Sequence, residues 1–118
     1  MSFVQFLFYQ GLTFLLYFFA IYLTAGGQGL VANMVMNFLT FFSISWLIAI
    51  PKSNFKTALP DVLAVTLSFN TVTYLLAYAL YSPLPSWQLL LFDYLMVIVY
   101  SIIGILAAMR LKQQQSER

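Results

Sequence analysis

Residues 86–109 read SWQLLLFDYLMVIVYSIIGILAAM and contain a single charged side chain, that of Asp93. About 20 apolar residues are enough for a helix to cross the hydrocarbon core of a bilayer. The strands of a membrane barrel are only about ten residues long and alternate in polarity, whereas this stretch is apolar on both faces. It therefore predicts a transmembrane helix, for which Ser86 is a suitable N-cap.

Three further stretches have the same length and character, and they comprise residues 3–24, 29–50 and 60–81. Gly26-Gly27 and Pro51 are natural helix ends after the first two, and Pro60-Asp61 is a natural start for the third. Over the whole chain 63% of the residues are hydrophobic and 7% are charged, against about 25% charged in soluble domains. We therefore expect an all-α, polytopic membrane protein with four transmembrane helices in two hairpins.

All five basic residues lie on one side of this arrangement, namely Lys52, Lys56, Arg110, Lys112 and Arg118. The connections after the first and third stretches carry no charge. Because cytoplasmic segments of membrane proteins are enriched in Lys and Arg, the pattern predicts that both termini and the middle connection face the cytoplasm. We expect a multi-pass protein of the plasma or inner membrane, oriented N-in and C-in.

One transmembrane domain and a short polar tail are expected, over residues 1–112 and 113–118. Within the domain, an offset of 60 residues aligns Asn33 with Asp93 and several apolar positions with each other. This pattern indicates two parallel halves, residues 1–59 and 60–112, related by an axis along the membrane normal. Chance alignment of apolar runs is the alternative.

The chain has no Cys and no His, which excludes thiol catalysis, disulfides and imidazole-based zinc sites. The sequence offers no pair of carboxylates, no nucleophile with a base and no glycine-rich phosphate loop. The net charge is only +2, and the basic residues lie at the predicted membrane edges. The charge therefore does not indicate nucleic-acid binding. We expect neither an enzyme nor a cofactor or metal site, and we expect membrane lipids as partners.

Polar residues recur within the second stretch, where Asn33, Asn37 and Thr40 follow the i, i+4, i+7 spacing of one helix face. One interpretation is a polar stripe that lines a path for a lipid headgroup. The other is a set of interhelical hydrogen bonds that hold the helices together, each worth about 0.6 kcal/mol. The sequence does not decide between these two interpretations for the three residues taken together.

Asp93 is the acidic residue inside a predicted span, about 10 Å below the start of its helix at a rise of 1.5 Å per residue. Such a group is costly in lipid and needs a partner or water. It would lie in a polar cavity that binds a cation, a proton or a headgroup. Alternatively, it would lie near the headgroup boundary, or be protonated and bonded to Asn or Tyr. Together with Asn33, Asn37 and Asn70 it forms the candidate polar groove.

At the opposite side of the membrane, cationic side chains are candidates for contacts with inner-leaflet phosphates. They are Lys52, Lys56, Arg110 and Lys112. In the last span, Gly104, Ala107 and Ala108 form a small-residue face suited to close helix packing, either within the chain or in a dimer.

The segment Gln28-Gly29-Leu30-Val31-Ala32-Asn33 precedes an apolar helix that ends in Lys52-Ser53-Asn54-Phe55. This layout resembles the GtrA-like family of small four-helix membrane proteins in length, hairpins and a basic middle connection. Ala32-Asn33 is similar to a pair in that family's second helix, and Asn70-Thr71 is similar to a pair on one of its odd-numbered helices. The resemblance implies transport of polyprenyl-phosphate-linked sugars across the membrane.

Three functions are therefore weighed. The first is translocation of a polyprenyl-phosphate-linked sugar, or assistance to it. The second is a structural or assembly subunit of a larger membrane complex, which the aromatic-rich first span suits. The third is a small proton- or cation-coupled exporter working as a homodimer, with Asp93 as its coupling carboxylate. Such a carboxylate is better placed near the midplane, and Asp93 is expected nearer the membrane surface.

Overall fold

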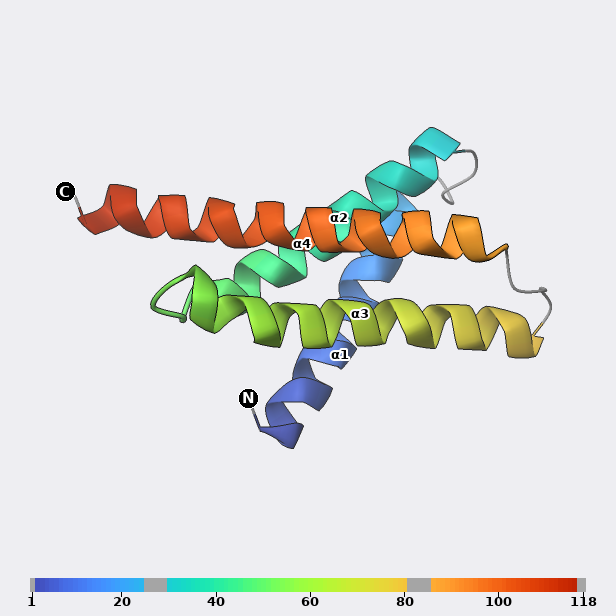
Figure 1. Cartoon of the computed structure of the whole chain (residues 1–118), viewed down its shortest axis with the longest axis horizontal. Coiled ribbons are helices and arrows are strands. Elements are labelled where there is room, and N and C mark those ends of the chain that lie inside the picture. The colour runs from blue at the N-terminus through green and yellow to red at the C-terminus, as the bar shows by residue number, and fades with distance from the viewer. Residues whose placement is uncertain (1, 25–29, 81–85, 117–118) are drawn as a thin grey trace.

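The computed structural model describes residues 2–24, 30–80 and 86–116. Its helices within these ranges are α1 (Phe3–Leu23), α2 (Leu30–Ala49), α3 (Phe55–Leu80) and α4 (Trp87–Ser116), shown in Figure 1. Each of the four is long and apolar enough to cross a membrane. The expected all-α class with four candidate membrane spans is confirmed.

Polar side chains cap the first turns of three of the helices. The Ser2 hydroxyl accepts a bond from the Gln5 backbone N–H at 3.2 Å, and the Gln5 side chain accepts one from the Ser2 N–H at 3.1 Å. The Ser86 hydroxyl accepts a bond from the Leu89 N–H at 3.4 Å, which confirms the predicted cap. These contacts satisfy N–H groups that have no partner inside a helix.

The predicted start of the third helix at Pro60 is wrong, because α3 begins at Phe55. The Asn54 side chain accepts a bond from the Thr57 N–H at 3.0 Å and so caps the helix five residues earlier. Pro60 therefore lies inside the helix, where its missing N–H leaves the Lys56 carbonyl without its helical donor. One lost bond near a helix end is tolerated when the cap is good.

The fourth helix continues beyond its predicted end at Met109 as far as Ser116. Lys112 and the glutamines that follow are good helix formers, so the helix proceeds after the apolar run has ended. Most of the segment expected as a polar tail is therefore helical. Glu117 and Arg118 lie outside the described residues.

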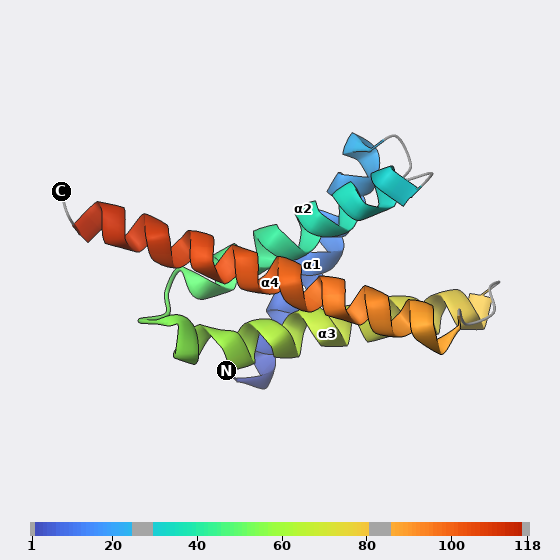
Figure 2. The same cartoon turned by 45° about the horizontal axis from the view of Figure 1, so that its top comes forward.

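Helix α2 contacts each of the other three helices, and its contact with α4 is the most extensive. Figures 1 and 2 show α3 and α4 running side by side, while α1 crosses them obliquely on the side of α2. Within the described residues α1 packs on α2 and α3 and does not touch α4. Of its side chains only Thr13 and Ala20 are buried.

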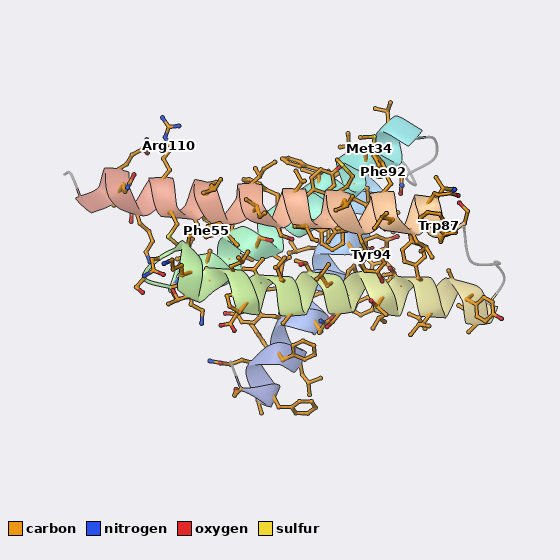
Figure 3. The ribbon with its side chains drawn as sticks, viewed as in Figure 1. Met34, Phe55, Trp87, Phe92, Tyr94 and Arg110 are labelled. Atoms are coloured by element: carbon orange, nitrogen blue, oxygen red, sulfur yellow. The ribbon has the colours of Figure 1, made fainter. Side chains whose placement is uncertain are left out.

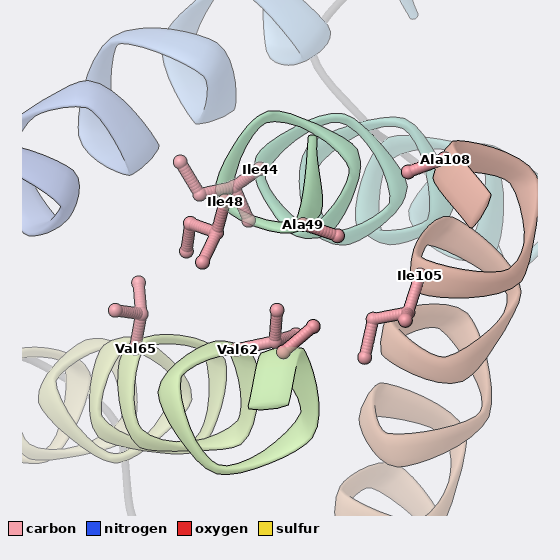
Figure 4. Packing of buried hydrophobic residues seen from close by; sticks show 8 residues of the cluster. Ile44, Ile48, Ala49, Val62, Val65, Ile105 and Ala108 are labelled. Atoms are coloured by element: carbon pink, nitrogen blue, oxygen red, sulfur yellow. The ribbon is translucent and has the colours of Figure 1, made fainter. Parts of the chain in front are cut away.

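Buried apolar side chains from α2, α3 and α4 form the core next to the connection between α2 and α3, and Figure 4 shows how they meet. They are Ile44, Ile48, Ala49, Ala58, Val62, Val65, Ile105 and Ala108. A second cluster lies farther along the helices and is mainly aromatic. It comprises Phe41, Phe69, Val97 and Tyr100.

The closest approach of α2 and α4 occurs at Gly104. A Cβ at this position would lie 2.7 Å from the Cβ of Ser45 and 2.8 Å from the carbonyl oxygen of Phe42. Glycine is therefore required for the two backbones to come this close. The predicted small-residue face is confirmed as a contact within the chain, with Gly104 and Ala108 buried in it.

We predict that Gly104→Ala destabilises the bundle, whereas Gly11→Ala on the open face of α1 does not. Overpacking at a close helix crossing should lower the free energy of unfolding by about 1–3 kcal/mol, while a Cβ at Gly11 meets nothing within 4 Å. Unfolding in detergent micelles, followed by intrinsic fluorescence, measures both variants. Equal stability of the two variants would show that the crossing has room for a methyl group.

Candidate functional site

Asp93 connects α4 with α3 through two hydrogen bonds. The side-chain amide of Asn70 donates to its Oδ2 atom at 3.0 Å, and the hydroxyl of Tyr74 donates to the same atom at 2.8 Å. The expectation that Asp93 bonds to Asn or Tyr is therefore met. Its Oδ1 atom receives no bond from the described residues and is not a buried atom, so it stays open to a ligand or to solvent.

Other polar contacts connect the same two helices next to Asp93 and farther along α4 toward the core. The hydroxyls of Thr71 and Tyr94 lie 2.7 Å apart, and Figure 3 places Tyr94 on the side of α4 that faces α3. Nearer the core, Ser101 donates to the hydroxyl of Thr66 at 3.1 Å. Hydrogen bonds thus connect residues 66–74 of α3 with residues 93–101 of α4, which fixes the position of Asp93.

All four members of the predicted polar groove line one cavity of about 260 Å³. Asn33 and Asn37 come from α2, Asn70 from α3 and Asp93 from α4. The rest of its wall includes four aromatic side chains, one of them from α1. The remaining lining residues are Tyr17, Phe41, Phe69, Thr73, Tyr74 and Ala77. The structure therefore joins residues that are 60 positions apart in the chain into a single polar chamber.

The two asparagines of α2 are not used to hold the bundle together. Neither Asn33 nor Asn37 makes a side-chain hydrogen bond to any described residue. Thr40, the third residue of the predicted stripe, is buried and donates to the carbonyl of Met36 in its own helix at 2.9 Å. Among the described residues, no interhelical bond of the expected kind is found at Asn33 or Asn37, and both side chains line the chamber.

A second cavity of about 230 Å³ adjoins the chamber and shares Asn33, Asn37, Tyr74 and Asp93 with it. Its remaining wall is apolar and is made by Met34, Leu89, Phe92, Met96 and Tyr100. Several of these side chains are exposed at the surface of the bundle, and Figure 3 shows Met34 and Phe92 close together between α2 and α4. The chamber therefore continues sideways into an apolar groove between these helices.

The basic side chains predicted to contact phosphates are not gathered into one site. Lys52 forms an ion pair with Asp61, with 2.6 Å between Nζ and Oδ2, and Lys112 donates to the backbone carbonyl of Lys52. Lys56 and Arg110 are exposed, and Arg110 points away from α3 in Figure 3. Lys52 and Lys112 thus connect the helix ends, while Lys56 and Arg110 lie at the surface, and contact of the four with inner-leaflet phosphates stays a prediction.

Sequence reasoning missed Tyr74 and the Lys52–Asp61 ion pair. Tyr74 follows Asn70 by four residues, so the helical spacing already placed both on one face of α3. The ion pair spans the connection between α2 and α3, and its geometry depends on where α3 begins. Because the start of α3 was predicted at Pro60, this ion pair was not predicted.

We predict energetic coupling between Tyr74 and Asp93. Tyr74→Phe removes one donor from a carboxylate and should lower the free energy of unfolding by about 1 kcal/mol. In an Asp93→Leu background the same change should have little effect, because the acceptor is already gone. Tyr94→Phe, which removes a hydroxyl at the exposed Thr71 contact, serves as the control. Additive effects of Tyr74→Phe and Asp93→Leu would contradict the contact.

No family model matches the chain, and no similar protein is found among curated proteins or among solved structures. The resemblance to the GtrA-like family therefore stays a prediction from Ala32-Asn33 and Asn70-Thr71. The function is therefore inferred from the geometry of the chamber and the groove.

Proposed function

We propose that this protein binds the headgroup of a polyprenyl-phosphate-linked sugar in the polar chamber and moves it, or helps to move it, across the membrane. The supporting observation is the set of unpaired polar groups in the chamber, the amides of Asn33 and Asn37 and the Oδ1 atom of Asp93. Unpaired polar groups at membrane depth are costly unless they bind water or a ligand. A sugar offers several hydroxyls to such groups.

The chemistry of the lining suits a sugar. An amide side chain both donates and accepts, as a hydroxyl does, and a carboxylate oxygen accepts. Aromatic side chains in the lining, among them Tyr17 and Tyr74, offer apolar surface to the C–H face of a sugar. A chamber of about 260 Å³ has room for a single sugar unit.

The adjoining groove suits the lipid chain. Met34, Phe92 and their neighbours make an apolar path from the chamber to the outside of the bundle. A polyprenyl chain lying in this groove would remain in apolar surroundings while the headgroup occupied the chamber. Only the polar part of the molecule would then need protection from the hydrocarbon core.

The N-in/C-in topology with two hairpins is part of the same proposal. It places the Lys52–Asp61 pair and the exposed Lys56 and Arg110 at the inner surface, where cations meet anionic lipids. The chamber then lies in the outer half of the membrane. A headgroup bound there would be on its way to the outer surface.

A second function, a subunit of a larger membrane complex, is supported by α1. This helix leaves large apolar side chains exposed along its length, among them Phe3, Phe8, Phe18 and Phe19. Lipid or other helices would cover them equally well. Native mass spectrometry after mild extraction distinguishes the two functions. A stable heteromeric assembly would favour the role as a subunit, and a protein without partners would favour the role in transport.

Single cysteines test the topology, since the natural chain has no Cys. Lys56→Cys and Gln88→Cys place thiols at exposed positions near opposite ends of the bundle. A membrane-impermeant maleimide applied to intact cells should label Gln88→Cys at once and Lys56→Cys only after permeabilisation. The reverse labelling pattern would overturn the orientation.

Reconstituted liposomes with a labelled polyprenyl-phosphate sugar test the transport. Asn37→Ala and Asp93→Ala should each reduce the rate of headgroup movement about tenfold or more, because each removes a polar contact worth about 1–3 kcal/mol. Ser43→Ala, on the same helix as Asn37 but outside the chamber, should keep the unmodified rate. Unchanged rates in both chamber variants would contradict the proposal.

A further inference from the structure

The chamber and its groove carry one carboxylate and no basic side chain in their described lining. Asp93 lines both, and neither Lys nor Arg lines either of them. Its partners Asn70 and Tyr74 are neutral donors. Along α4 the nearest described basic residue is Arg110, about 25 Å away at 1.5 Å per residue.

The basic residues that approach each other do so at the other end of the bundle. Lys52 is paired with Asp61, and Lys112 donates to the carbonyl of Lys52. Charges held in these contacts do not compensate a carboxylate in the chamber. The charge that balances Asp93 must therefore come from outside the described chain, or a proton must take its place.

Three of the aromatic side chains that line the chamber with Asp93 pack against one another. The centroids of Tyr17 and Phe69 lie 5.7 Å apart and those of Phe41 and Phe69 lie 6.0 Å apart, both in edge-to-face geometry. All three rings line the chamber. Ring faces attract cations, and aromatic walls beside a carboxylate are a recurring way to bind an organic ammonium group.

We infer that the headgroup accepted by the chamber carries a protonated amine, as an amino sugar does. This inference rests on the proposed function, since it specifies the headgroup that the chamber binds. The ammonium group would lie beside Oδ1 of Asp93, with hydroxyls on the amides of Asn33 and Asn37. A neutral sugar would leave the carboxylate without a counter-charge, whereas an ammonium group would supply one.

Three amphiphiles that share one alkyl chain test this inference on the unmodified protein. They are an alkyl glucosaminide, its N-acetylated form and the corresponding alkyl glucoside, each titrated into protein held in phosphatidylcholine nanodiscs. Calorimetry should show the glucosaminide binding about tenfold or more tightly than the other two, which corresponds to about 1.4 kcal/mol. Empty nanodiscs correct for partitioning into the lipid.

Asp93→Asn should abolish this preference while the two neutral amphiphiles still bind. Asp61→Asn, the same change at the ion pair with Lys52, should retain it. Equal affinity of the unmodified protein for all three amphiphiles would overturn the inference and leave the proposed function standing. Binding of none of them would instead count against the proposed function. A preference that survives Asp93→Asn would also overturn the inference.

Discussion

The close crossing of α2 and α4 at Gly104 determines how the rest of the bundle packs. Because the backbones nearly touch there, the helices must separate on both sides of the crossing. Toward the basic end, the space is filled by Ile48, Ile105 and other apolar side chains. Toward the opposite end, Asn37 and Asp93 lie about 12 Å and 16 Å along their helices from the crossing, and the separation there becomes the polar chamber.

Polar side chains in this protein fall into two groups by what they bind. Asn70, Ser101 and Gln10 are used for structure, since they donate to Asp93, to Thr66 and to the Val65 carbonyl. The amides of Asn33 and Asn37 remain unpaired within the chamber. In lipid a polar group without a partner is costly. Ligand binding is therefore inferred from Asn33 and Asn37 and not from the residues that are used for structure.

Much of the fold was predictable, and the errors have identifiable causes. The first two helices were expected at residues 3–24 and 29–50 and are found at Phe3–Leu23 and Leu30–Ala49, because apolar length alone delimits a membrane helix. The start of α3 was misplaced because the Asn54 cap outweighs the signal of Pro60. The ion pair between Lys52 and Asp61 was not predicted, because nothing in the linear order places Asp61 against Lys52.

By itself the sequence determined the class of the protein, the number of its helices and the end that carries its charges. These properties follow from local composition and length, which do not depend on how helices pack. Helical spacing also placed Asn33 and Asn37 on one face. Only the tertiary structure decided that Thr40 bonds to its own helix, that Asn70 is held by Asp93 and that Asn33 and Asn37 stay free. Those outcomes depend on the rotation of each helix about its axis and on where α2 and α4 cross.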